Sequence, residues 1–349
     1  MLVLGDRASV SRATIATELA SRWPAATIIG CSTAGQIAGT DVFDEGLCAT
    51  AIRFEHTAVR VAAAPVTAAD SLAAGAALAK ALAGPHLVHV LVLSEGLDIN
   101  GEALVRGLGE LLPAGVSVSG GLSADGEHFQ KTVVLSGGVA QTNRVTAIGL
   151  YGTSLKVGCG SLGGWDSFGP ERQITRSHGN VLYELDGQSA LALYKRYLGE
   201  HASGLPASGL LFPLSLRTRD ASAPVVRTIL SVDEADHSLT FAGNVPVGGY
   251  VRLMRANFDR LIDGAVGAGR ISADALGTPV DLALLVSCVG RRMVLRQRVE
   301  EEVEGVRDIV GPGATIAGFY SYGEISPFTP NARCELHNQT MTVTTLSER

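Results

Sequence analysis

Three stretches of the chain repeat one pattern, and this repeat constrains the fold more than any other feature of the sequence. Each stretch is an apolar, β-like run that ends in G-x-x-x-x-G followed by Gln or Glu, at residues 26–37, 117–128 and 314–325. The first and third stretches also share Ala, Thr and Ile before the loop and Ile after it. Such self-similarity indicates a structural unit that is built several times.

The same order of elements surrounds each copy of the loop. A solid apolar run, typical of a strand buried on both faces, comes first, at residues 1–4, 87–94 and 282–287. A segment with helical apolar spacing follows, at residues 10–23, 104–112 and 299–310. Further strand-like runs come after the loop, at residues 47–54, 131–138, 145–152 and 341–346. We therefore predict a strand–helix–strand–loop–strand unit whose first two strands are parallel and whose returning strands are antiparallel.

The repeat predicts an α/β fold that borders on α+β, with mixed β-sheets flanked by helices. Because 349 residues exceed one comfortable hydrophobic core, we expect two domains. Two units lie in the first part of the chain and one in the second, so we place the domains at residues 1–186 and 187–349. Residues 67–83 and 257–268 each predict one additional helix, before the second and third units.

Less regular sequence separates the second unit from the third. Residues 186–198 predict a helix that ends at Gly199. Residues 225–232 and 238–242 predict a pair of hairpin strands.

The composition bounds the partners and the compartment. A formal net charge of −6 argues against nucleic acid and against anionic membrane surfaces, because both attract basic proteins. The five cysteines form no C-x-x-C and are odd in number, which indicates free thiols in a reducing compartment. No segment is long and apolar enough to span a bilayer, and the first residues are too short for a signal peptide. We expect a cytoplasmic protein.

The first loop, GCSTAG, nearly matches a phosphate-binding P-loop. Gln36 and Ile37 replace the Lys and the hydroxyl residue that P-loop chemistry needs, and no helix pattern follows. We therefore interpret the loop as a ligand-binding corner at the end of a buried strand, where ligands of open α/β sheets lie. The alternative is a tight turn in which the glycines only supply positive φ. The candidate ligand-binding residues are Gly30, Cys31, Ser32, Thr33 and Gly35.

The third loop carries more polar groups than the first. Two tyrosines can both pack against a ligand and hydrogen-bond to it, and the carboxylate can pair with an amine. The candidate residues here are Tyr320, Ser321, Tyr322, Gly323 and Glu324. The alternative is a buried tyrosine pair that serves the core, with Glu324 bonded to backbone N–H groups of the turn.

Two further groups of residues are candidates because of their position. Asn338, Gln339 and Thr340 open an apolar strand, and buried amides require partners, either a ligand or the neighbouring loop. Cys288, Arg291 and Arg292 close a buried strand, where the guanidinium of Arg291 or Arg292 could hold a carboxylate or phosphate. The alternative is an arginine that pairs with glutamates of the next helix.

The strand ends of the second and third units carry opposite charges. The second unit carries Glu95 at the strand end that matches residues 287–292 of the third, so the two strand ends could accept the amine and the acid of an amino acid. A nucleophilic role for Cys31 or Ser32 is the enzyme alternative. G-x-S-x-G, H-E-x-x-H and S-x-x-K are all absent from the chain, so we expect no enzyme.

These residues carry a resemblance to a known family. GCSTAG in the first unit, GFYSYGEI with LHNQT in the last, and YELDGQSALALYKRYLG between them resemble the FIST family, with FIST-N and FIST-C domains. The similarity runs over nearly the whole chain. Two departures are that Gln36 stands where the family usually has Glu, and that the family's N-terminal helix is missing, which leaves open whether Met1 is the true start.

The resemblance implies a bacterial intracellular sensor of a small ligand, such as an amino acid or small acid, that signals to a partner such as a histidine kinase, a diguanylate cyclase or a chemoreceptor. One subgroup of the family binds heme and responds to nitric oxide, for which His337 is the first candidate axial ligand and His178 the second. The remaining alternatives are the thiol- or hydroxyl-dependent enzyme and a protein-interaction scaffold like the family's F-box relatives.

Overall fold

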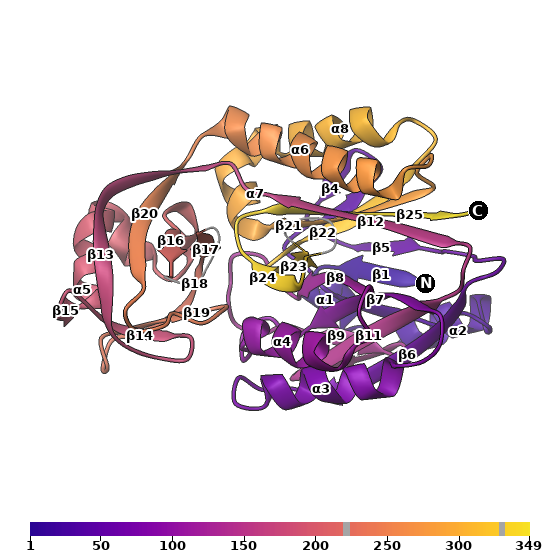
Figure 1. The fold of residues 1–349 in the computed structure, drawn as a ribbon, viewed down its shortest axis with the longest axis horizontal. Coiled ribbons are helices and arrows are strands. Elements are labelled where there is room, and N and C mark those ends of the chain that lie inside the picture. Colours follow the sequence, from indigo (N-terminus) through magenta and orange to yellow (C-terminus); the bar gives the residue numbers. More distant parts are fainter. Residues whose placement is uncertain (219–223, 328–331) are drawn as a thin grey trace.

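The computed structural model describes residues 1–218, 224–327 and 332–349, and it confirms a mixed α/β fold. Two parts are distinct in Figure 1. The larger part, which we call the three-sheet body, contains the described residues of 1–164 and 257–349, and the smaller part, the inserted domain, contains the described residues of 165–256. The boundary between these two parts in space therefore differs from the domain boundary that we predict at residue 186. The predicted boundary concerns the repeated units of the sequence, and it stays a prediction.

The parallel strand pairs predicted for the three units are all present. The pairs are β1 (Leu2–Gly5) with β2 (Ile29–Ser32), β7 (Leu87–Ser94) with β8 (Ser117–Leu122), and β21 (Leu282–Cys288) with β22 (Thr315–Ser321). The helical segments that connect them are α1 (Arg7–Val10) and α2 (Ile15–Arg22), α4 (Gly101–Leu111), and α7 (Val289–Leu295), η3 (Arg296–Arg298) and α8 (Val299–Val310).

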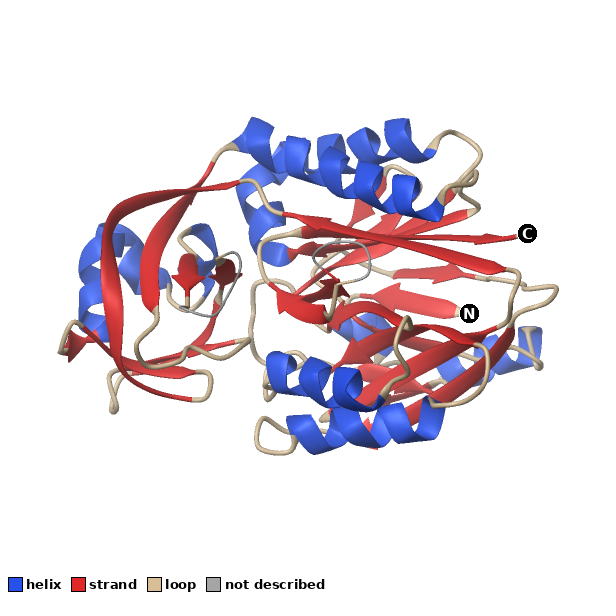
Figure 2. Ribbon diagram, in the orientation of Figure 1, coloured by secondary structure: helices blue, strands red, loops and turns tan. Residues whose placement is uncertain are grey.

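The returning strands are antiparallel, as predicted. They are β5 (Leu47–Thr50) on β1, β11 (Arg144–Tyr151) on β7, and β25 (Met341–Glu348) on β21. The additional helices predicted before the second and third units are α3 (Ser71–Leu82) and α6 (Phe258–Leu276). In Figure 2 the helices cover the outside of the body, with α3 and α4 on one side and α6 and α8 on the other.

In each unit, the strand that follows the loop pairs with a strand in the sheet of another unit. The strand after the first loop, β3 (Gln36–Ala38), pairs with β22 of the third unit. The strand after the second, β9 (Val134–Ser136), pairs with β2 of the first. The strand after the third, β23 (Glu324–Pro327), pairs with β8 of the second. The three sheets are therefore linked in a closed ring.

Five short or edge strands complete the three sheets. They are β4 (Asp41–Phe43), β6 (Ala58–Pro65), β10 (Val139–Gln141), β12 (Leu155–Leu162) and β24 (Cys334–His337). The sheet orders are β10-β9-β2-β1-β5, β24-β23-β8-β7-β11-β6 and β12-β25-β21-β22-β3-β4. The sheets enclose one central core, to which each contributes apolar side chains, among them Leu4, Cys31, Leu93, Val286 and Phe319.

The inserted domain leaves the body through β13 and returns through β20, with its own hydrophobic core. Its strands are β13 (Trp165–His178), β14 (Val181–Leu185), β15 (Gln188–Ser189), β16 (Leu214–Arg217), β17 (Val225–Arg227), β18 (Ile229–Asp233), β19 (Ser238–Phe241) and β20 (Tyr250–Ala256). Its helical segments are α5 (Ala190–Leu198), η1 (Gly199–Gly204) and η2 (Ala207–Leu211).

Both sequence predictions for the inserted domain can be compared with these elements. The predicted helix runs to Leu198 and is capped by Gly199, whose φ of 57° confirms the glycine stop. The predicted hairpin is confirmed for β18 and β19, which pair antiparallel. The β17 strand, expected to extend that hairpin, pairs with β16 instead.

Candidate functional site

The three loops meet at one end of the body and bond to one another in a ring. The Ala34 N–H donates to the Tyr320 carbonyl at 2.9 Å, and the Ala124 N–H donates to the Ser32 carbonyl at 2.9 Å. The Tyr322 N–H completes the ring by donating to the Leu122 carbonyl at 3.4 Å. Related strand exits therefore converge, as the sequence repeat predicts, and their backbone groups satisfy each other.

The second loop does not have the register that the G-x-x-x-x-G pattern predicts. A Cβ atom on Gly30, Gly120 or Gly318 would lie 1.9–2.0 Å from a carbonyl oxygen of the neighbouring parallel strand. The equivalent of Gly30 and Gly318 is therefore Gly120, and not Gly121 as the aligned motif implies. Residues 125–132 form an extra loop in this unit, and Val133 then occupies the ring position held by Gly35 and Gly323.

The polar side chains of the first loop are hydrogen-bonded within the protein. The Ser32 hydroxyl accepts from the Val133 N–H at 3.0 Å, and the Thr33 hydroxyl donates to the Gly5 carbonyl at 3.2 Å. Cys31 points into the central core, where burial raises the pKa of its thiol well above the ordinary value. A thiol held in its protonated form is a poor nucleophile, so this geometry gives the enzyme alternative no support.

Glu324 of the third corner is a fully buried carboxyl group with three donors. The Ser321 hydroxyl donates to Oε1 at 2.7 Å, and the backbone N–H and hydroxyl of Thr340 donate to Oε2 at 3.2 and 3.1 Å. Burial nevertheless raises the pKa of Glu324 to about 8, against the opposing effect of these bonds and of Arg291. Burial, with a contribution from Glu324, also raises the pKa of the nearby Cys288 thiol.

Arg291 is bonded within the protein. Its guanidinium pairs with Glu302 of α8 at 2.7 Å, with both side chains fully buried, and it donates to the carbonyls of Gly163 and Leu261. The Tyr320 and Ser287 hydroxyls donate to the same carboxylate, at 2.8 and 3.0 Å. This arrangement corresponds to the alternative of an arginine paired with the next helix, because four of the five guanidinium N–H groups have acceptors among the described residues and no pair of them is left to fork a ligand.

The two strand ends that could share an amino acid have separate partners. Glu95 is buried and accepts from the Thr132 hydroxyl at 2.7 Å and from the Leu97 and Asn143 N–H groups. Tyr322 likewise uses its hydroxyl inside the second unit, donating to Asp125 at 2.5 Å while its ring stacks on Phe129. Glu95 and Tyr322 are therefore bonded within the protein, at the end of the body where the three loops meet.

Asn338, Gln339 and Thr340 lie where the inserted domain covers the strand exits of the third unit. Asn338 accepts from the Thr228 N–H at 3.4 Å and donates to the Tyr322 carbonyl at 3.2 Å. Gln339 donates from its side chain to the Leu210 carbonyl at 2.9 Å, and its own carbonyl accepts from the Trp165 indole at 3.1 Å. This segment therefore joins the body to the inserted domain.

Gln339 is also under two local constraints. Its φ of 64° lies in the left-handed region, which is costly for a non-glycine residue. Its side chain is fully buried, and within the described residues its Oε1 atom has no hydrogen-bond partner. The hydroxyl of Thr228, 1% exposed, is a second buried polar group without a partner in the described part of the chain. Unpartnered buried polar atoms and backbone strain are features of binding sites.

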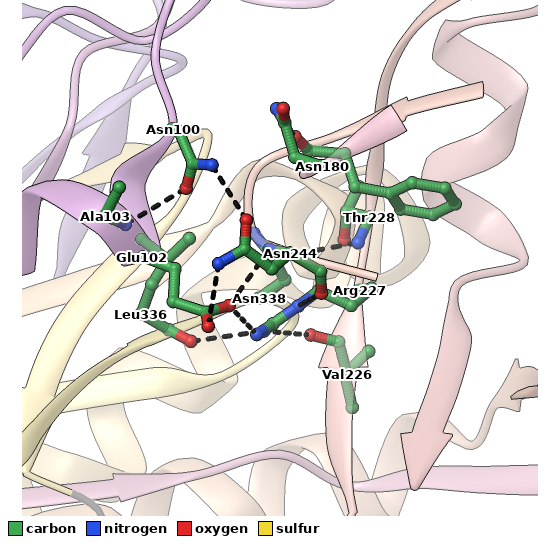
Figure 3. Close-up of polar contacts among 11 residues, drawn as sticks. Asn100, Glu102, Ala103, Asn180, Val226, Arg227, Thr228, Asn244, Leu336 and Asn338 are labelled. Atoms are coloured by element: carbon green, nitrogen blue, oxygen red, sulfur yellow. Dashed lines mark hydrogen bonds and ion pairs between the residues drawn. The ribbon is translucent and has the colours of Figure 1, made fainter. Parts of the chain in front are cut away.

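Next to these two residues, a polar network crosses the same interface (Figure 3). Arg227 donates to Glu102 at 2.7 Å and to the Leu336 carbonyl at 3.3 Å. Asn244 donates to both oxygens of Glu102, at 2.9 and 3.1 Å, and accepts from Asn100 at 2.9 Å. Burial lowers the pKa of Arg227, and the charge of Glu102 opposes this effect.

The sequence patterns described above do not predict this network. One available signal was a single arginine, Arg227, within an otherwise apolar strand pattern. A second was Asn100, whose side chain caps α4 by accepting from the Ala103 N–H at 3.0 Å. Neither signal shows in the sequence that the two segments meet, because 127 positions separate residues 100 and 227.

The two predicted heme ligands do not fit that role. The Nε2 atom of His337 lies 2.9 Å from the Ser326 carbonyl, and burial lowers the pKa of this imidazole to about 4. His178 is exposed at the end of β13. Neither residue lines the two cavities described below. Among residues 1–218, 224–327 and 332–349, no three His, Cys, Asp or Glu side chains group closely enough to hold a metal ion.

No helix in the described part of the chain is long and apolar enough to cross a membrane. Comparison with curated proteins finds no match. Among solved structures, the chain is similar to cyanuric acid hydrolase from A. caulinodans, at 12% identity and a TM-score of 0.20, over 84% of this chain and 99% of that one. A likeness at this TM-score carries no argument about function.

The comparison with protein families gives two matches that together span most of the chain. The FIST N domain model matches residues 1–188, and the FIST C domain model matches residues 190–327. These matches agree with the resemblance carried by GCSTAG, GFYSYGEI and LHNQT. The chain belongs to the FIST family.

Proposed function

We propose that the protein is a sensor whose small ligand binds where the inserted domain covers the strand exits of the third unit. FIST domains are associated with small-ligand sensing in signal transduction, and both of them match here. The observation that carries the proposed location is Gln339, which is buried, in a strained backbone conformation, and without a partner for its Oε1 atom within the described residues.

The chemistry of this interface favours a ligand with a hydrogen-bond donor. The Gln339 Oε1 atom can only accept, and the Thr228 hydroxyl can accept or donate. A ligand ammonium or amide N–H beside Gln339 would satisfy its Oε1 atom. An amino acid or an amidated small acid has such a donor.

The connection of the inserted domain supports a change of state on binding. The chain enters this domain in β13 and leaves it in β20, and the described contacts with the body include the polar bonds of Arg227, Thr228, Asn244 and Leu210. A ligand that bonds to both sides would favour one orientation of the domain, and it shifts the equilibrium only by its difference in affinity for the two states. In this proposal a kinase, cyclase or chemoreceptor in the cytoplasm reads the orientation.

The experiment is a thermal-shift screen of amino acids and small carboxylic acids, followed by calorimetry on each compound that binds. Gln339→Gly removes the amide and relieves the backbone strain, so it should fold well but bind the ligand at least about tenfold more weakly. Gln339→Asn keeps an amide oxygen and tolerates the left-handed conformation, so it should retain part of the affinity.

His237→Gly is the matched control, because it removes an exposed side chain at a φ of 53° elsewhere in the inserted domain. It should bind like the unaltered protein. If no compound in the screen binds, or if Gln339→Gly binds as tightly as His237→Gly, the ligand site is not here, and the scaffold alternative gains support.

A further inference from the structure

At the end of the body away from the inserted domain, the central core opens into a cavity of about 490 Å³. This end carries both chain termini in Figure 1. All three sheets contribute apolar side chains to the cavity wall, among them Ile29, Leu91, Ile148, Leu284 and Leu346. The volume is within the range of small-molecule sites in proteins, which are mostly apolar with few polar groups.

A strap without regular secondary structure, residues 51–57, forms part of the cavity lining, and its exposed residues Ala51 and Arg53 mark where the lining reaches the surface, which we call the mouth. Ile52 and Phe54 line the cavity and pack against the central core. The far end of the strap is fixed by the Glu348 carboxylate, which accepts from the Glu55 N–H at 2.6 Å, the His56 N–H at 3.0 Å and the Thr57 hydroxyl at 2.5 Å. The strap is therefore anchored beside the mouth, and its apolar side chains form part of the wall.

The polar side chains of the cavity are distributed unevenly. His89 forms part of the interior wall, but Ser117 and Ser119 bond to its two ring nitrogens at 2.7 and 3.1 Å. Burial also lowers the pKa of His89 to about 4, so its imidazole is neutral at pH 7. Arg53 of the strap is the one charged side chain among the lining residues. No hydrogen bond or ion pair of its guanidinium is found within the described part of the chain.

Two carboxylates beside the strap, those of Glu348 and Asp281, already have partners. A second cavity, of about 440 Å³, shares Ile52, Arg53 and Phe54 with the first. Of the three acidic residues around it, Glu348 is bonded to the strap, and Asp281 accepts from Ser347 at 2.8 Å and from Arg349 at 2.9 Å. The third, Glu55 of the strap, is exposed and forms no ion pair with Arg53 in the described part of the chain. The Arg53 guanidinium is therefore available to an anionic group from outside.

We propose that this cavity binds an apolar molecule that carries one anionic group, such as a medium-chain or aromatic carboxylate. The apolar body lies among the side chains of the three sheets, where each methylene removed from water adds to the affinity. The anion lies at the mouth beside Arg53. A sugar or nucleotide is disfavoured, because the interior wall offers almost no free donors or acceptors to replace the water that such a ligand would lose.

The experiment is calorimetric titration of the full chain with decanoate and with decanol, both below the concentrations at which they aggregate. Both should bind with saturable heat at one site. Arg53→Gln should weaken decanoate about threefold to fivefold, the usual size of an exposed charge pair, and leave decanol unchanged. Ile148→Trp should weaken both ligands at least about tenfold, because the indole fills the cavity from a partly buried position.

Two controls keep the result interpretable. Val139→Trp adds the same indole at a side chain that is 53% exposed and outside the lining, so it should bind both ligands normally. Arg176→Gln removes an exposed guanidinium of the inserted domain and should also bind both. The proposal is overturned if neither ligand binds the unaltered chain, or if Ile148→Trp still binds. Its anionic part is overturned if Arg53→Gln affects the two ligands equally. Because the Gln339 variants are read with different ligands, failure here leaves the sensor proposal to its own test.

Discussion

Arg227 of the inserted domain and Glu102 in the first turn of α4 form an ion pair of 2.7 Å across the interface between the two parts of the protein. The arginine side chain is 6% exposed, and the glutamate side chain is 36% exposed. Of the two, the guanidinium therefore depends more on its partner, because water can still reach the carboxylate.

Glu102→Gln should consequently destabilise the protein by about 2 kcal/mol, since it leaves a buried cation without its counter-charge. The free energy of unfolding from urea titration measures this change. The matched control is Glu184→Gln, which breaks the exposed pair between Arg176 and Glu184 and should cost less than about 1 kcal/mol. Equal losses in the two variants would show that the interfacial pair is solvated like a surface pair.

Glu324 should make the protein less stable as pH rises. Its folded pKa of about 8 lies above its ordinary value of 4.5, so the folded state keeps a proton that the unfolded chain releases between these values. The contribution is fully present below about pH 4.5 and is lost as pH rises through about 8. Relative to Glu324→Gln, the unaltered protein should lose at least about 1 kcal/mol between pH 5 and pH 8.

Urea titrations of both proteins across this range provide the measurement. The two stability curves should run parallel above about pH 9, where the folded and unfolded states are both ionised. Parallel curves between pH 5 and pH 8 as well would show that Glu324 is ionised in the folded protein.

His89 should produce the opposite dependence at lower pH. Its folded pKa of about 4 lies below the ordinary value of 6.5, so the unfolded chain takes up a proton first as pH falls. Stability from this group is present above about pH 6.5 and is lost towards pH 4. Compared with His89→Gln, the unaltered protein should therefore lose stability more steeply below pH 6.5, while the two curves run parallel above about pH 7.5. An identical slope in both proteins below pH 6.5 would contradict the assignment.

The corrected register of the second loop can be tested with two glycines. Gly120→Ala places a methyl group 1.9 Å from the Val92 carbonyl at a φ of 142°, so the backbone must move, and we expect a loss of more than about 2 kcal/mol. Gly109→Ala, in helix α4 with open space around it, should instead stabilise the protein by about 0.5–1 kcal/mol. Thermal unfolding of both variants gives the comparison. A mild effect of Gly120→Ala would reject the new register.

The sequence was informative where the signal is local. The strand–helix–strand order of each unit follows from apolar spacing within about 40 residues, and the stop at Gly199 follows from one glycine after an amphipathic helix. The extra loop at residues 125–132 made the predicted register of the second loop wrong. Gly126 has the spacing of the motif, but Val133 occupies the position in the ring that the second glycine of the motif holds in the other two units.

The pairing of strands that lie far apart in the chain could not be predicted from the sequence. The β3 and β9 strands have three residues each, too few for a periodic pattern, and each pairs with a strand far away in the chain. The partner of the Arg291 side chain could not be predicted, for a similar reason. A strand-end arginine suits a ligand or a helix glutamate equally well, and only the fold brings Glu302 to it.

The ring of exchanged strands makes the three units mutually obligate. The first unit alone leaves β3 without β22, the second leaves β9 without β2, and the third leaves β23 without β8. Each unit in isolation would thus expose strand edges with unpaired N–H and C=O groups, and such edges promote aggregation. The body closes only when β1–β3 and β22–β25 are all present, so a nascent chain cannot finish it before β25 emerges.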